Sequence, residues 1–273
     1  MALAASPMSI RTDVASRDRL VIGLGIALAA AVAWAYTFYE ARRMNVTGVC
    51  HCVGLKMGGA DLASWSASSI LPLFIMWAVM MLAMMLPTAT PMLLTFAAVG
   101  RNRRKAGRPY VSVAIFAGGY VAIWSAFSVV AAVAQWWLHR TALLSPMMAS
   151  SSDLMAGTLL LMAGLFQFTS LKQSCVIRCR APLDFMMTGW REGARGAFHM
   201  GIEHGAFCAG CCWALMALLF VLGVMNILWI AALTIVVAAE KLLPRAKWLS
   251  AAIGSILVCW GLWVMAGPRL IAL

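Results

Sequence analysis

Residues 198–223 read FHMGIEHGAFCAGCCWALMALLFVLG, and the interpretation of the whole chain starts from them. Their length and apolar character predict a helix that crosses a bilayer, which requires about 20 residues. The stretch nevertheless carries polar and metal-ligating side chains: His199, Glu203, His204, Cys208, Cys211 and Cys212. Because such groups are costly at membrane depth, they predict a functional site inside a membrane helix.

Four of these side chains share one face of the predicted helix when successive residues are placed about 100° apart. They are His204, Cys208, Cys211 and Cys212. Thiolate and imidazole ligands suit a soft or borderline metal, so copper is the first candidate and zinc the second. The alternative is that the cysteines are small apolar residues packed between helices. His199 and Glu203 lie on the opposite side and either bind a metal or hydrogen-bond a neighbouring helix.

The composition predicts a membrane protein of the all-α class. Of the 273 residues 63% are hydrophobic and 11% are charged, whereas soluble domains contain about 25% charged residues. The net charge of +12 is not concentrated in a soluble basic module, so we expect no nucleic-acid ligand. Most of the eight cysteines lie in or beside apolar segments, which argues against the disulfide framework of a secreted domain.

The apolar segments predict a polytopic bundle of about seven spans, at 20–39, 70–96, 110–137, 154–171, 198–223, 227–243 and 250–267. The second span contains Pro87 and Pro91, so we expect it to be kinked or broken. The fifth and sixth spans are separated by three residues and should form an antiparallel hairpin.

The distribution of basic residues predicts the orientation of the chain. With the N-terminus inside, 16 of the 21 Lys and Arg lie on the cytoplasmic side, in the tail and in 101–108, 172–195 and 241–247. This asymmetry follows the positive-inside rule and places the C-terminus outside. We expect one bundle domain over 20–267, between a cytoplasmic tail at 1–19 and a short tail at 268–273, in an inner (plasma) membrane that supplies lipid as a partner.

Two methionine stripes follow the second span at helical spacing: Met76, Met80 and Met84 on one, and Met81, Met85 and Met92 on the other. Thioethers can hold Cu(I) in lipid without burying an anion. A methionine stripe also fills irregular gaps in ordinary helix packing. We include Met76, Met80 and Met84 among the candidate metal ligands.

Two further cysteine motifs lie outside the predicted spans. Cys50, His51 and Cys52 fall on the outer side, where they predict a capture point for an incoming ion or disulfides to partners. Cys175 and Cys179 are one helical turn apart on the cytoplasmic side. They predict a delivery or sensing pair, or else a basic helix end that faces lipid headgroups.

Polar groups at the ends of two other spans are candidates for internal pairing. Glu240 and Lys241 end the sixth span. We expect Glu240 to neutralise Lys241 or Lys247; the alternatives are that it reaches the interface or couples to proton movement. Gln167 is a buried polar group in the fourth span that is expected to hydrogen-bond toward the bundle.

No catalytic or nucleotide-binding motif is recognisable in the chain. It contains no Walker loop, no dinucleotide glycine pattern and no G-x-S-x-G. HMGIEH differs from the H-E-x-x-H zinc motif because its glutamate is misplaced. CAGCC resembles a redox C-x-x-C but lies in a predicted membrane helix rather than after a strand. We expect no nucleotide partner and assign no catalytic residue.

Four stretches together carry a family resemblance: MWAVMMLAMMLPTATPM, FQFTSLKQSCVIRCRAPLDFM, GIEHGAFCAGCCWALM and VAAEKLLPRA. With them, the chain resembles the bacterial family of predicted metal-binding integral membrane proteins that carry the domain of unknown function numbered 2182. The resemblance covers about residues 70–243. It places the family's functional motifs on Met76–Pro87, on Lys172, Cys175, Cys179 and Arg180, on Gly205, Cys208, Gly210, Cys211, Cys212 and Trp213, and on Glu240 and Lys241.

The predicted function is to bind a soft metal ion and to move it, or hand it over, across the membrane by ligand exchange. The ion would pass from Cys50, His51 and Cys52 through the methionine stripe to the cysteines of 198–223. A metal donor or acceptor protein is the expected partner. Two alternatives are a structural or assembly subunit of a larger complex and a membrane thiol oxidoreductase that uses Cys208 and Cys211.

Overall fold

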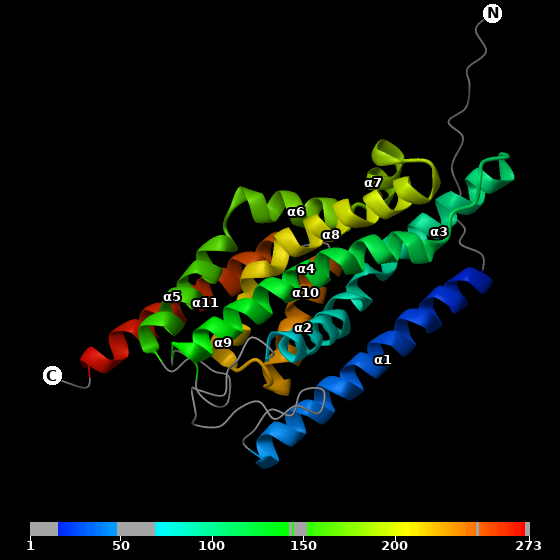
Figure 1. Ribbon diagram of the computed structural model, residues 1–273. Coiled ribbons are helices and arrows are strands. Elements are labelled where there is room, and N and C mark those ends of the chain that lie inside the picture. The colour runs from blue at the N-terminus through cyan, green and yellow to red at the C-terminus, as the bar shows by residue number, and fades with distance from the viewer. Residues whose placement is uncertain (1–15, 48–68, 142–143, 145–151, 244–245, 271–273) are drawn as a thin grey trace, which may run out of the picture.

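The protein is described by a computed structural model that covers residues 16–47, 69–141, 144, 152–243 and 246–270. These residues fold into helices, which confirms the all-α class (Figure 1). In chain order the helices are α1 (Ser16–Thr47), α2 (Ile70–Met85), η4 (Pro87–Ala89), α3 (Thr90–Lys105), α4 (Val113–Arg140), α5 (Asp153–Phe166), α6 (Ser170–Arg180), α7 (Pro182–Gly189), α8 (Gly193–Ala217), α9 (Leu219–Leu222), α10 (Ile227–Leu242) and α11 (Ala246–Leu270).

Four helical stretches within the described residues are long and apolar enough to cross a membrane, in α1, α4, α8 with α9, and α11. Two bent pairs, α2 with α3 and α5 with α6, raise the number to six if each pair is one span. The chain therefore has the helices of a multi-pass membrane protein. The count falls short of the seven predicted spans because α10 has only 16 residues, fewer than the about 20 that a straight span needs.

The polar connection predicted over 172–195 is largely helical. It contains most of α6 and all of α7, and Lys172 is 1% exposed. Lys172 is therefore part of the buried interior. The positive-inside count, which places Lys172 in a cytoplasmic loop, is wrong for this residue. A loop is predicted from the sequence because α6 is short and rich in charge, whereas the burial of α6 depends on its packing against α8.

Glycines bring α4 and α8 into backbone contact at the centre of the bundle. A Cβ atom on Gly119 would lie 2.1 Å from the carbonyl oxygen of Phe198, and one on Gly201 would lie 2.0 Å from that of Phe116. Small residues permit this close approach between membrane helices. The two helices lie side by side along their length (Figure 1), and this contact fixes α8 against the aromatic face of α4.

The break after α2 is where the prolines predicted it, with a bend of 41° between α2 and α3. Pro87 has no N–H to bond the carbonyl four residues earlier, that of Ala83. The indole Nε1 of Trp34 in α1 donates to this carbonyl instead, at 3.1 Å. The carbonyl of Met85 accepts from the hydroxyl of Thr88 at 2.8 Å. The break thus leaves backbone acceptors at the bundle centre for side chains of other helices.

The chain bends again by 62° between α5 and α6. Thr169 starts α6 as its N-cap, because its hydroxyl accepts from the backbone N–H of Lys172 at 3.3 Å. Capping satisfies one of the amides that a helix start leaves without an intrahelical partner. The bend directs α6 across α8, so that Cys175 lies against Gly210.

Ion pairs join the helix ends at the arginine-rich end of the bundle. Arg103 in the last turn of α3 pairs with Glu192, and Arg108 lies 3.9 Å from the same carboxylate. The hydrogen bond from Arg103 is the main reason why the pKa of Glu192 is below its usual range. Both arginines thereby tie the loop after α3 to the start of α8.

Candidate functional site

Cys208 lies at the point where α4, α8 and α10 meet. Its Sγ is 3.0 Å from the hydroxyl of Tyr120 and 2.9 Å from the Nζ of Lys241. The same Tyr120 hydroxyl donates to the carbonyl of Met85 at 3.0 Å, which is one of the acceptors exposed by the proline break. Cys208, Tyr120 and Lys241 are all buried, so this thiol is held by polar partners inside the bundle.

Lys241 is surrounded by sulfur atoms and a hydroxyl. Besides Cys208, its ammonium donates to the hydroxyl of Thr88 at 3.3 Å and approaches the Sδ of Met85 at 3.8 Å. A lysine is expensive inside a membrane bundle and marks a functional position by default. Thioether and thiol sulfur are weak hydrogen-bond acceptors. The sulfur atoms of Cys208 and Met85 that surround the ammonium are better ligands for a soft metal cation than hydrogen-bond acceptors for a lysine.

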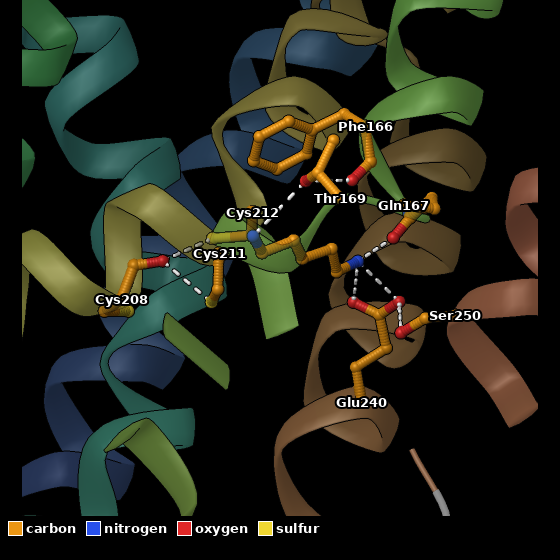
Figure 2. A network of polar contacts seen from close by, with 9 residues as sticks. Phe166, Gln167, Thr169, Cys208, Cys211, Cys212, Glu240 and Ser250 are labelled. Carbon is orange, nitrogen blue, oxygen red and sulfur yellow. Dashed lines mark hydrogen bonds and ion pairs between the residues drawn. The ribbon is translucent and has the colours of Figure 1, made fainter. Parts of the chain in front are cut away.

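The remaining cysteines of α8 face α6. The thiols of Cys211 and Cys212 both donate to the carbonyl of Cys208 at 3.0 Å, and Figure 2 shows this carbonyl between them. The Cys211 sulfur also hydrogen-bonds with Cys179 of α6. The Sγ of Cys175 would lie 3.1 Å from a Cβ on Gly210. Thiols of α6 and α8 therefore lie at the interface between these two helices.

His204 lies one turn before Cys208 within an aromatic cage. Its ring stacks on Tyr120 at 5.5 Å between centroids and on Phe116 at 6.1 Å, and Phe185 covers it edge-on. Its Nδ1 is buried and finds no hydrogen-bond partner among the residues that the structure describes. A buried polar nitrogen without a partner is unfavourable, so this atom is a free acceptor or ligand beside the Cys208 site.

Lys172 and Glu240 form a second buried centre, at side-chain exposures of 1% and 2%. The Lys172 ammonium lies 2.7 and 2.8 Å from the two carboxylate oxygens and also donates to the side-chain oxygen of Gln167 (Figure 2). Ser250 of α11 donates to the same carboxylate at 2.9 Å. The prediction that Glu240 neutralises Lys241 or Lys247 was therefore wrong. Consecutive residues of a helix point about 100° apart, so Glu240 and Lys241 reach different neighbours.

The chain that forms this centre can be compared with known protein families. A family model described as PpoB2, copper chaperone, matches residues 74–264. The chain belongs to this family. Membership of the PpoB2 family implies copper binding and the handing of copper to an acceptor protein. The match includes the Met-rich α2, the thiols of α6 and α8, and Lys241. No curated protein and no solved structure is detectably similar to the chain.

The other residues predicted as ligands are placed as follows. Met76, Met80 and Met84 are buried in the core of this PpoB2-family chain, and Met85 from the second stripe is the methionine that approaches Lys241. In the described part of the chain no three His, Cys, Asp or Glu side chains come together as a metal site. Cys50, His51 and Cys52 lie outside the described residues.

His199 and Glu203 form a separate, partly exposed pair. Their side chains are 3.5 Å apart and are 50% and 32% exposed. Glu203 also accepts from Arg191 at 2.8 Å. The partners are thus within α8 and in the link that precedes it, not on a neighbouring helix as the hydrogen-bonding alternative expected. The pair lies on the side of α8 away from Cys208.

Sequence reasoning missed Tyr120 and Thr88 and gave Met85 no role of its own. Tyr120 lies in an apolar helix with other aromatic residues, so nothing local distinguishes it. A signal did exist for Met85 and Thr88, since they flank Pro87, and a proline break in a membrane helix frees backbone groups that need new partners.

Proposed function

We propose that this chain binds Cu(I) between Cys208 of α8 and Met85 of α2 and passes it to an acceptor protein. The observation that carries the proposal is the position of the Lys241 ammonium. It lies within contact distance of both sulfur atoms, at 2.9 and 3.8 Å, inside a buried centre. Copper is the substrate that the protein carries, and the Lys241 ammonium occupies the position that we propose for the Cu(I) ion.

The donor set fits Cu(I) better than Zn(II). Structural zinc sites take four nitrogen, sulfur or oxygen ligands in tetrahedral geometry. Within the described residues not even three His, Cys, Asp or Glu side chains converge. Cu(I) prefers thiolate and thioether ligands and accepts few of them. Cys208 and Met85 provide one of each, and the free Nδ1 of His204 lies one turn away.

Lys241 gives this site a means of release. With Cys208 as a thiolate, the ammonium and Cu(I) carry the same charge, so exchange of one for the other needs no proton transfer at the sulfur and leaves the charge of the buried centre unchanged. Lys241 is in the last turn of α10, and a lysine at a helix end can extend its ammonium to the interface while its stem stays buried. Copper binding displaces Lys241, and the return of Lys241 favours copper release.

The thiols between α6 and α8 supply the next ligands. Cys211 interacts with Cys179 and shares the Cys208 carbonyl with Cys212. Ligand exchange from Cys208 to Cys211 and Cys179 would bring the ion toward the surface where an acceptor protein docks. On the entry side, the path would run from Cys50, His51 and Cys52 along Met76, Met80 and Met84.

We place this transfer in a bacterial inner membrane, with the N-terminus of one bundle domain in the cytoplasm. Counting α10 as a short span gives the seven crossings that the sequence predicts. We also infer that the family with the domain of unknown function 2182, suggested by the motifs, is the same group of proteins. Zinc is the second cargo if copper is excluded.

The test is a Cu(I) titration of detergent-purified protein against the chromophoric chelator bicinchoninate, under anaerobic reducing conditions. We expect about one tightly bound Cu(I) per chain. Cys208→Ser should weaken binding more than about 100-fold, beyond the range of a ligand's supporting residues. The matched control is Cys259→Ser, because Cys259 is a free, exposed cysteine on α11. Equal binding by both variants would contradict the proposal.

One observation favours the thiol oxidoreductase as second candidate, although with a different pair from the one predicted. Cys211 interacts with Cys179 of another helix, whereas its bond to the predicted partner Cys208 goes to the backbone carbonyl of that residue. Thiol trapping with a maleimide would show Cys179 and Cys211 cycling between oxidised and reduced forms. Protein without copper that co-purifies with a stable partner would instead support a structural subunit.

A further inference from the structure

A cavity that none of the cysteines lines opens between α1, α3 and the start of α4. It has a volume of about 450 Å³. Its inner wall is apolar and is formed by Ile22 of α1, Phe96 and Ala97 of α3, and Val113 of α4. The cavity lies at the end of the bundle where the basic residues of α3 gather.

The outer rim of the cavity is basic. Arg101 and Arg104 are three residues apart on α3, so they lie on the same side of the helix, and both line the cavity. Arg101 pairs with Asp18 of α1. Arg104 lies over the ring of Tyr110, 5.4 Å from its centroid, and forms no ion pair with the described residues. Two arginines and one carboxylate leave a net positive charge at the rim.

The start of α4 adds to this charge. Ser112 is its N-cap and accepts from the backbone N–H of Ala114 at 3.2 Å. Ser112 and Val113 both line the cavity. The first amides of a helix and the positive end of its dipole favour an anion. The rim therefore offers guanidinium, phenol and helix N-terminus to one negatively charged group.

The surroundings of the cavity are those of lipid. Only 11% of the apolar window in α1 is buried, and Leu20, Val21 and Leu24 next to the cavity are each more than 60% exposed. These side chains must face acyl chains when the helix crosses a bilayer. A soluble anion would pair with the arginines of the rim and leave the apolar wall at Ile22 and Phe96 uncovered. An amphiphile, with an anionic headgroup and an apolar chain, would cover both the rim and the wall.

We propose that this cavity binds an anionic phospholipid. The phosphate lies at Arg101 and Arg104, and the first part of an acyl chain packs on Ile22, Phe96 and Ala97. The lipid then fills the gap between α1 and the rest of the bundle at the arginine-rich end. This site is independent of copper and of the Cys208 centre.

The test is native mass spectrometry of the full chain in detergent, with phosphatidylglycerol, phosphatidylcholine or inorganic phosphate added. Phosphatidylglycerol should be retained in preference to phosphatidylcholine. Arg104→Gln should lower its retention about fivefold, since one arginine near an anionic headgroup contributes about this much. The control is Arg108→Gln, which removes a charge from the loop directly after α3 at a residue outside the cavity lining.

Ala97→Leu tests the apolar wall without any change of charge. It should fill the cavity and lower phosphatidylglycerol retention, while the melting temperature without lipid reports whether the variant is folded. Equal retention of the two lipids, or equal effects of Arg104→Gln and Arg108→Gln, would overturn the proposal. Displacement of the lipid by inorganic phosphate would also overturn it, in favour of a soluble-anion site.

Discussion

Two buried lysines lie close to the end of α10 in opposite chemical surroundings. Lys172 is bound by oxygen atoms, two from Glu240 and one from Gln167. Lys241 is bound mainly by sulfur, from Cys208 and Met85. Lys172 has three oxygen acceptors, two of them from one carboxylate, whereas Lys241 has a single close sulfur partner in Cys208 and a neutral thioether that accepts weakly. The first lysine is therefore fixed, and the second can be exchanged.

The two centres are joined by the neighbouring positions of Glu240 and Lys241 on α10. Because these side chains point about 100° apart, one helix end holds Lys172 on one side and reaches Cys208 on the other. The ion pair of Glu240, reinforced by Ser250 of α11, holds the helix end that carries Lys241. The Lys172–Glu240 ion pair thereby positions Lys241 beside Cys208.

Loss of the oxygen-bound lysine should have the largest effect. Lys172→Met leaves Glu240 as a buried unpaired charge, and we expect about 3–5 kcal/mol of destabilisation. Denaturant unfolding in detergent measures it, with Lys247→Met as the control because Lys247 is exposed. The double variant with Glu240→Leu should recover most of the loss. A single variant that unfolds like the control would show that the pair is not a structural centre.

Loss of the sulfur-bound lysine should act on copper more than on folding. Lys241→Leu removes the competitor for Cys208, so Cu(I) affinity should rise more than about tenfold, as expected for a lost hydrogen bond to a charged group. Transfer of copper to bicinchoninate should slow down in the same proportion. Lys247→Leu is the matched control. A weaker affinity in Lys241→Leu would mean that the lysine supports copper binding and does not compete with it.

Loss of the Tyr120 hydroxyl should have the smallest effect. Tyr120→Phe keeps the ring that stacks on His204 and removes the bonds to Cys208 and the Met85 carbonyl. We expect a loss of about 1 kcal/mol in stability, together with a moderate fall in Cu(I) affinity. Tyr39→Phe, on the exposed side of α1, serves as the control in thermal unfolding. An unchanged melting temperature would show that the Tyr120 hydroxyl does not stabilise the Cys208 centre.

The sequence predicted those features that depend on neighbouring residues. The all-α class, the helix that carries the cysteines and the break at Pro87 follow from apolar length and proline chemistry. The pairing of Glu240 could not be predicted, because Lys172 is 68 residues away and looked like a loop charge. The contact of Lys241 with Cys208 depends on how α8 and α10 pack, which no local pattern encodes.

X-ray absorption spectroscopy at the copper edge of the Cu(I)-loaded protein would show directly whether copper takes the place of Lys241 between Cys208 and Met85. The proposed site predicts a first shell dominated by sulfur, which loses one sulfur scatterer in Met85→Leu and most of its signal in Cys208→Ser. Met80→Leu, a buried methionine of the same helix, should leave the spectrum unchanged. A shell of nitrogen or oxygen, or a spectrum insensitive to Met85→Leu, would contradict this site.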